Sequence, residues 1–382
     1  MGNIEKYMLD SKDLMITDSF SKADSVLNSR GYKHIQASIS GGADSDILLD
    51  LCEKTARKQH IRYTWFDTGL EYEATKEHIS DLERQYHIRI EHVPAVKPIP
   101  LCCHTYGVPF LSKYVSSQIE RLQRYGFIWK DLPYSVLVHL YPKCSSALKW
   151  WCNAYTTPGF DRPSHFSIDY NRGLKEFLIT HPPDFRISSK CCAYAKKLPS
   201  LFYARQNHID LSLTGVRKSE GGIRATAYSG CFSATDKSGI AQYRPLFWYA
   251  NDTKKQYESV FGIQHSRCYT AYGMKRTGCA GCPYNRNLLK ELAIIEKYES
   301  KLYHAVCNIF HDSYRYTRMY REFVAALDAK NQKGGSLWTI TTHYRTLISP
   351  LLIKRGSVQS AIKLMAIHHA NIITMPIRWK KS

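Results

Sequence analysis

The feature that most constrains the fold is a glycine-rich turn, Ser40–Ser45 (Ser-Gly-Gly-Ala-Asp-Ser), between a predicted strand and a predicted helix. Apolar residues alternate over residues 35–39, and residues 47–55 have the spacing of a helix with a buried face. Such a turn points free backbone N–H groups at one place and therefore favours a bound phosphate. The simpler alternative is a helix cap by Asp44, which the strand–turn–helix context and the doubled glycine make less attractive. The turn lacks the Gly-Lys-Ser/Thr of P-loop NTPases.

Alternating strand and helix patterns surround this turn. Further strands are predicted at residues 61–66, 88–93 and 210–213, and helices at residues 11–30 and 72–86. This order is typical of an α/β fold with a parallel sheet and right-handed crossovers.

Three regions follow from the pattern. Residues 1–250 are predicted to form the nucleotide-binding domain. Residues 94–165, rich in Pro, Tyr, Trp and Cys, are expected to be an insertion over the nucleotide pocket. Residues 251–382 hold a Cys-x-x-Cys segment and a basic, mainly helical C-terminal region.

The net charge and the cysteine content indicate which partner, compartment and cysteine chemistry to expect. The net charge is +20, and residues 251–382 hold 21 Lys and Arg against 8 Asp and Glu. This surplus predicts a nucleic-acid partner, with a merely solvated basic face as an equally weighted alternative. The polar N-terminus and the lack of a long apolar stretch predict a cytoplasmic protein with no membrane contact. In that setting the 12 cysteines are expected to be reduced, some of them as metal ligands.

Four cysteines have a suggestive spacing. Cys191 and Cys192 are adjacent, and Cys279 and Cys282 form a Cys-x-x-Cys followed by proline. Four thiolates suit a 4Fe-4S cluster, while a structural Zn²⁺ site on the same residues is the main alternative. Cys268 is a possible substitute for one member of the adjacent pair. Four further cysteines match no motif: Cys102, Cys103, Cys144 and Cys152.

The motifs together resemble a known family. The Ser40–Ser45 turn is similar to the signature of PP-loop ATP pyrophosphatases. Residues 66–72 (Phe-Asp-Thr-Gly-Leu-Glu-Tyr) resemble the end of the second strand in the phosphoadenosine phosphosulfate (PAPS) reductase branch. Residues 214–220 (Thr-Gly-Val-Arg-Lys-Ser-Glu) resemble its later Gly-x-Arg motif. The resemblance covers roughly residues 33–290 without the insertion.

This resemblance implies a Rossmann-like sheet of the adenine nucleotide alpha-hydrolase (PP-loop) type, which binds ATP or PAPS with Mg²⁺. It places phosphate on the first turn, with Arg217 as a charge clamp, and adenosine near Asp67 and Gly215. Asp44, Ser45 and Arg217 are the implied catalytic residues. The implied nucleotide-binding residues are Ser40, Gly41, Gly42, Asp44, Ser45, Asp67, Thr68, Gly215 and Arg217. The cysteine pattern resembles the iron–sulfur motif of adenylyl-sulfate reductases and of the sulfur-activating subunit of DNA phosphorothioation systems.

Three functions are compatible with these motifs. The first is an ATP-dependent sulfur-transfer enzyme that acts on DNA or RNA and receives sulfur from a donor such as a cysteine desulfurase. The second is a sulfonucleotide reductase, although the sequence lacks the cysteine-containing tail of those enzymes, since its last cysteine is Cys307. The third is a non-catalytic nucleotide and cluster sensor. Residues 314–321 alternate Tyr and Arg, which suits nucleic-acid contacts or, equally, an amphipathic helix with buried tyrosines.

Overall fold

A computed structural model describes residues 3–29, 31–56, 61–155, 164–221, 227–233 and 239–331. The chain divides into a unit of residues 1–321 and a second unit of residues 322–382. Gly334, Gly335 and Ser336, whose sequence favours a break in the helical C-terminal region, lie outside the described part, as do the residues after them. No helix in the described part of the chain is long and apolar enough to cross a membrane.

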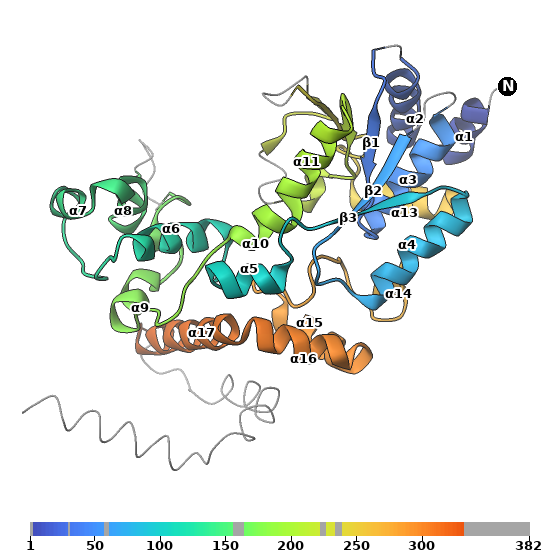
Figure 1. Cartoon of the computed structure of the whole chain (residues 1–382). Coiled ribbons are helices and arrows are strands. Elements are labelled where there is room, and N and C mark those ends of the chain that lie inside the picture. Colours follow the sequence, from blue (N-terminus) through green and yellow to red (C-terminus); the bar gives the residue numbers. More distant parts are fainter. Residues whose placement is uncertain are drawn as a thin grey trace, which may run out of the picture. The chain divides into compact units, whose positions relative to one another are not determined.

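The first unit is built on a six-stranded, mostly parallel sheet, as the strand pattern predicts (Figure 1). Its strand order is β3-β2-β1-β4-β6-β5. The strands are β1 (Ile35–Ser38), β2 (Ile61–Asp67), β3 (Ile90–Pro94), β4 (Leu211–Leu213), β5 (Phe232–Ser233) and β6 (Ala241–Tyr243). All neighbouring pairs are parallel except β5 with β6. The predicted ends of β1 to β4 agree with the structure within two residues, whereas β5 and β6 are too short to give a periodic signal.

Helices bury the apolar side chains of this sheet. Those in contact with its core cluster are α1 (Asn3–Ser11), α2 (Leu14–Leu27), α3 (Ala43–Thr55), α4 (Glu73–Tyr86) and α13 (Asn251–Phe261). Helix α2 begins where Asp13 accepts hydrogen bonds from the amides of Met15 and Ile16, a cap that satisfies two otherwise unpaired donors. The fully buried Phe20 and Tyr257 join α2 and α13, with ring centroids 6.0 Å apart.

The described part of the insertion, residues 94–155 and 164–165, is mainly helical, which its sequence does not reveal. These are α5 (Ile99–Tyr106), α6 (Lys113–Arg124), α7 (Tyr134–Leu140), the 3-10 turn η1 (Pro142–Cys144) and α8 (Ser145–Trp151). Trp150 and Trp151 are completely buried, and Trp151 packs edge-on against Phe127 at 5.2 Å between ring centroids. These tryptophans therefore form a local core of the insertion.

The remaining elements lead from the insertion to the C-terminal helices. They are the 3-10 turn η2 (Ile168–Tyr170), α9 (Leu174–Thr180), α10 (Lys190–Cys192), the π-helical η3 (Ala193–Lys197), α11 (Leu198–Gln206), the 3-10 turn η4 (Lys218–Glu220), α14 (Arg267–Thr270), α15 (Leu288–Tyr298), α16 (Ser300–Ile309) and α17 (His311–Asn331). The apolar residues from Leu288 to Ile309 recur with a helical period, but the structure has two helices there, α15 and α16, with a break at Glu299 (φ −137°, ψ 62°). The break has a tertiary cause, because the Glu299 carboxylate accepts hydrogen bonds from the first amides of α4, at Glu73 and Ala74.

Candidate functional site

The glycine turn connects β1 to α3, as its sequence predicts. Gly41 has φ +67°, and a side chain there would meet Thr75 Cγ2 at 2.8 Å, so this position requires glycine. A side chain at Gly42 would meet Ser40 Oγ at 3.2 Å and Thr277 Oγ1 at 3.3 Å. The turn therefore runs in close contact with α4 and with the segment before the Cys-x-x-Cys.

Ser45 holds this turn in shape. Its hydroxyl oxygen accepts hydrogen bonds from the amides of Ser40 (3.2 Å) and Gly42 (3.1 Å). The same hydroxyl donates to the Gly42 carbonyl at 2.7 Å. Ser45 thus draws two amides of the turn toward one oxygen atom, and a phosphate bound by these amides would have to take the place of that hydroxyl. Ser40 itself is exposed.

Asp44 lies between two cations. Its Oδ1 accepts a hydrogen bond from Arg217 Nε at 2.9 Å and lies 2.8 Å from Lys254 Nζ. Arg217 is only 7% exposed, and it also donates to the Tyr249 carbonyl and to the Asn251 side chain. Arg217 therefore ties the Gly-x-Arg motif to the turn through Asp44. Lys254, which no motif indicates, adds a second cation there.

Gly215 allows the Gly-x-Arg motif to pack closely against the glycine turn. A Cβ at this position would lie 2.6 Å from the carbonyl oxygen of Asp44. Only glycine allows this approach between the end of β4 and the start of α3. The structure thus brings Ser40–Ser45, Gly215 and Arg217 together.

The end of β2 holds the other predicted nucleotide residues. Asp67 accepts a hydrogen bond from the Gly69 amide at 2.8 Å and lies 2.9 Å from His92 Nε2. Thr68 is buried, and its hydroxyl donates to Glu71 Oε1 at 2.6 Å. Asp67 remains partly exposed. The Thr68 side chain, in contrast, is buried and stabilises the loop through its bond to Glu71.

A buried acid and two histidines support the start of α3. Asp46 is 1% exposed, and its Oδ2 lies 2.7 Å from His265 Nδ1. His265 Nε2 lies 2.9 Å from Glu258 Oε1. Burial alone would lower the pKa of His265, but its hydrogen bonds to Asp46 and Glu258 outweigh burial and raise the pKa to about 9. His78 Nε2 lies 3.1 Å from Asp46 Oδ1 without the alignment of a hydrogen bond. No local sequence signal marks this network, because its members come from four separate segments.

The four motif cysteines are neighbours in the fold. Cys191 and Cys192 lie in α10, and the turn through Ala280 and Gly281 carries Cys279 and Cys282. Gly281 has φ +60°, and a Cβ there would lie 2.6 Å from Tyr314 Oη and 2.9 Å from Val306. This turn therefore depends on glycine, a constraint that the motif alone does not show.

Their surroundings combine burial with positive charge. Burial raises the pKa of Cys279, and Lys196 opposes this shift. A hydrogen-bonding contact with Cys191, together with burial, raises the pKa of Cys192, and Lys113 and Lys196 oppose it. Burial and the neighbouring Cys279 and Cys192 raise the pKa of Cys282 to about 12. The thiols thus favour the protonated form and would lose protons on binding a metal.

The donor set suits an iron–sulfur cluster or zinc in its chemistry. Four adjacent thiols with Lys196 beside them provide the ligands and a compensating charge. Across the described ranges, no group of three or more His, Cys, Asp or Glu side chains already has the spacing of a metal site. The cysteine side chains would therefore have to turn toward a common centre.

The Cys-x-x-Cys segment also touches both predicted nucleotide loops. The Ala280 amide donates to the Leu70 carbonyl at 3.0 Å, next to the Asp67 loop. Tyr269 Oη accepts a hydrogen bond from the Ala43 amide in the glycine turn and another from the Thr277 amide, both at 3.2 Å. Segments more than 200 residues apart in sequence thus meet at one place.

The tyrosines of residues 314–321 have structural roles. Tyr316 is 2% exposed and donates its hydroxyl proton to the His181 carbonyl. Tyr314 donates to the Gly281 carbonyl, and Tyr320 to the Arg172 carbonyl at 2.8 Å. The alternative of an amphipathic helix with packed tyrosines is therefore correct for these rings. Arg315 is partly exposed and lies 3.1 Å from Asp184.

Comparison with known proteins adds a match over the first part of this site. Residues 34–98 match the family model of the phosphoadenosine phosphosulfate reductase domain. The phosphate complex of PAPS reductase from Candida auris is 13% identical, with a TM-score of 0.38, over 72% of this chain and 93% of that chain. The U34-tRNA thiolase NcsA from Methanococcus maripaludis, with its 4Fe-4S cluster, is 13% identical, with a TM-score of 0.35, over 82% of this chain and 80% of that chain. The search of curated proteins gives no match. The segment with the glycine turn and Asp67, residues 34–98, is thus similar to the phosphoadenosine phosphosulfate reductase domain.

Proposed function

We propose that this chain is a PP-loop enzyme that uses ATP to activate an oxygen of a nucleic-acid acceptor for replacement by sulfur. One observation carries the proposal. The Cys-x-x-Cys segment contacts the glycine turn through Tyr269 and the Asp67 loop through Ala280. Nucleotide chemistry and sulfur chemistry would therefore share one site.

The chain's residues support adenylation as the first step. The glycine turn at the start of α3 would bind the pyrophosphate that leaves when an acceptor oxygen attacks the α-phosphate, with a phosphate oxygen replacing Ser45 Oγ as the acceptor for the Ser40 and Gly42 amides. Arg217 and Lys254 supply positive charge beside them, with Asp44 holding both in place. Mg²⁺ bound with the nucleotide would add charge neutralisation. Asp67 is the candidate contact for adenosine.

The cysteines support the sulfur-transfer step. Cys191, Cys192, Cys279 and Cys282 would hold a 4Fe-4S cluster, which supplies a place to bind or pass sulfur. Lys196, which lies beside Cys279 and Glu71, would balance its charge. Zn²⁺ on the same four thiols is the alternative occupant. A cysteine desulfurase or another sulfur donor would supply the sulfur.

A sulfonucleotide reductase is the second candidate. The family match over residues 34–98 favours it. This activity would need a nucleophilic thiol, which the insertion cysteines or another protein would supply.

The decisive experiment compares the products of the two reactions. With ATP, Mg²⁺ and nucleic acid, the first function releases pyrophosphate and leaves sulfur in the nucleic acid, which mass spectrometry detects. With PAPS and a thiol, the second releases sulfite. A protein that gives neither product, yet binds nucleotide, would instead be a sensor.

Asp44→Ala tests the site within this experiment. The substitution removes the shared partner of Arg217 and Lys254, so we expect pyrophosphate release and nucleotide affinity to be lost. Asp18→Ala, in an exposed ion pair with Lys22, is the matched control. Thermal unfolding of both variants separates a binding defect from misfolding. Unchanged affinity of Asp44→Ala in calorimetry would contradict the assignment.

Metal analysis of anaerobically purified protein tests the cysteine site. A 4Fe-4S cluster gives about four irons per chain and a brown colour that Cys279→Ser removes. About one zinc and no iron would establish the alternative.

A further inference from the structure

A fifth cysteine lies beside the four motif cysteines, although no motif includes it. Cys103 lies in α5 and packs in the same buried cluster as Cys191 of α10. The two helices are in direct contact. The Cys103 thiol also raises the pKa of Cys191, which reflects the same proximity.

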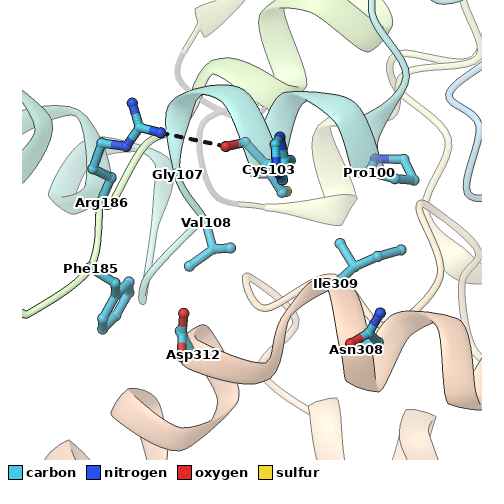
Figure 2. Close-up of a pocket in the computed structure, with 10 residues that line it drawn as sticks. Pro100, Cys103, Gly107, Val108, Phe185, Arg186, Asn308, Ile309 and Asp312 are labelled. Carbon is cyan, nitrogen blue, oxygen red and sulfur yellow. Dashed lines mark hydrogen bonds between the residues drawn. The ribbon is translucent and has the colours of Figure 1, made fainter.

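Cys103 also lines a cavity of about 410 Å³ (Figure 2). This volume lies within the range of small-molecule sites. Figure 2 shows the two sides of the cavity. One side is formed by α5 and the loop with Phe185 and Arg186, and the facing side carries Asn308, Ile309 and Asp312. The lining residues are Pro100, Cys103, His104, Gly107, Val108, Phe185, Arg186, Asn308, Ile309 and Asp312.

The charges around this cavity suit a zwitterion. Arg186 is exposed and lies on one side, where its guanidinium donates to the His104 carbonyl at 3.5 Å. Asp312 lies on the opposite side, and His311 and Arg315 contact its carboxylate at 3.3 Å and 4.0 Å. An amino acid could place its carboxylate toward Arg186 and its ammonium toward Asp312, while its side chain extends toward Cys103.

We propose that Cys103 accepts sulfur from a small amino-acid persulfide, of the cysteine persulfide class, bound in this cavity. The proposal rests on the proposed sulfur-transfer function and names its donor class. The Cys103 thiolate attacks the outer sulfur of the persulfide, the bond between the two donor sulfurs breaks, and a new bond joins the outer sulfur to Cys103. The inner sulfur of the donor leaves as a thiolate and takes up the proton that the Cys103 thiol released, so no oxidant or reductant is consumed. The transferred sulfur then lies beside Cys191.

Peptide mass spectrometry tests this step in the full-length protein. Anaerobic protein is incubated with cysteine persulfide whose outer sulfur is isotopically heavy, alkylated, and digested. We expect the heavy sulfur on Cys103. Cys102→Ser is the matched control, because Cys102 is the adjacent cysteine of the same helix and is also buried. That variant keeps the label, whereas Cys103→Ser loses it. Label on Cys102 or Cys191 with none on wild-type Cys103 overturns the proposal.

Arg186→Ala tests recognition separately from reactivity. The rate with cysteine persulfide should fall about tenfold, as expected for loss of one charge-assisted contact. The rate with inorganic hydrodisulfide, which has no carboxylate, should be unchanged. Equal rates with cysteine persulfide in wild type and variant overturn the assignment of the cavity. Labelling of Cys103 by a desulfurase-bound persulfide alone overturns the small-molecule donor.

The outcome is independent of the nucleotide reaction, because persulfide transfer needs no ATP. Cys103 labelling without pyrophosphate release would contradict the proposed function and leave the sulfur-accepting role intact. Pyrophosphate release without Cys103 labelling would contradict the sulfur-accepting role of Cys103 and leave the proposed function intact.

Discussion

His265 shows how one side chain can couple the start of α3 to pH. Its two ring nitrogens face Asp46 and Glu258, and the charged imidazolium satisfies both acids at once. Asp46 belongs to the first turn of α3, directly after the glycine turn. Loss of the imidazolium charge would leave a buried carboxylate poorly paired, which is costly.

The pH dependence of the unfolding free energy follows from the raised pKa of His265. The pKa of His265 rises from 6.5 to about 9 on folding. Its stabilisation is therefore complete below pH 6.5 and is lost as the pH rises toward 9. We expect the free energy of unfolding to fall over this window by on the order of 2–3 kcal/mol in the wild type. Urea denaturation across this window measures it.

The comparison variant is His265→Gln, which cannot carry the charge and should show a much flatter profile. His304→Gln, at an exposed position, is the control and should follow the wild type. Identical slopes for wild type and His265→Gln would contradict the role of this network.

Gly281 occupies a position in the Cys-x-x-Cys turn that has no room for a side chain. Gly281→Ala places a methyl group 2.6 Å from Tyr314 Oη at a positive φ. We expect a loss of about 2–4 kcal/mol in unfolding free energy, from strain and overpacking, together with loss of bound metal. Gly278→Ala, in the same segment with open space around it, should change neither quantity. Equal melting temperatures and metal contents in both variants would show that the turn is not constrained as described.

The tyrosines of helix α17 hold the helix against two other parts of the fold. Tyr314 and Tyr316 fix its first turns to the Gly281 and His181 carbonyls, and Phe110 and Phe177 pack on the Tyr316 ring at 4.8 Å and 4.9 Å. This face therefore stabilises both the Cys-x-x-Cys turn and the insertion. The arginines of the same helix remain the candidates for phosphate contacts.

Substitution of Tyr316 tests the packing role. Tyr316→Phe should lower the unfolding free energy by about 1–2 kcal/mol, because the His181 carbonyl loses its donor. Tyr316→Ala should cost about 3–5 kcal/mol through the cavity left among the aromatic rings. Arg315→Gln, which breaks a surface ion pair, should cost below about 1 kcal/mol. Thermal or urea unfolding ranks the three, and a different order would refute the packing role.

The whole chain carries a net charge of +20, so positive charges remain in excess however the ion pairs are arranged. A nucleic-acid partner is the proposed reason, since a polyanion releases counterions when lysines and arginines neutralise its phosphates.

Salt dependence of binding measures this contribution. Affinity for DNA or RNA should fall linearly on a log–log plot against salt. Replacing Arg315, Arg318 and Arg321 together by Gln should reduce the slope by up to about 3, because each neutralised phosphate contributes about 0.9. The triple variant should lose affinity for all sequences alike, since phosphate contacts carry no base information. An unchanged slope would exclude these arginines from the interface, and no binding at low salt would exclude the partner.

Local sequence patterns predict strands β1 to β4 and the residue types of the candidate site. Residues 35–39 and 61–66 carry local strand signals, and the turns after them require glycine or a short polar residue for local backbone reasons. Such constraints involve neighbours along the chain, so pattern and motif reveal them. The four motif cysteines and the Ser40–Ser45 turn were found in this way.

Which of these features lie together depends on the three-dimensional packing of the chain. Lys254 beside Asp44, Glu299 on the amides of α4, and Cys103 beside Cys191 each join segments far apart in the chain. The helices of the insertion were also hidden, because Trp150 and Trp151 pack inside it and leave no clear apolar period. Long-range packing sets these contacts, and hydrophobic periodicity carries no record of which distant surface a side chain will meet.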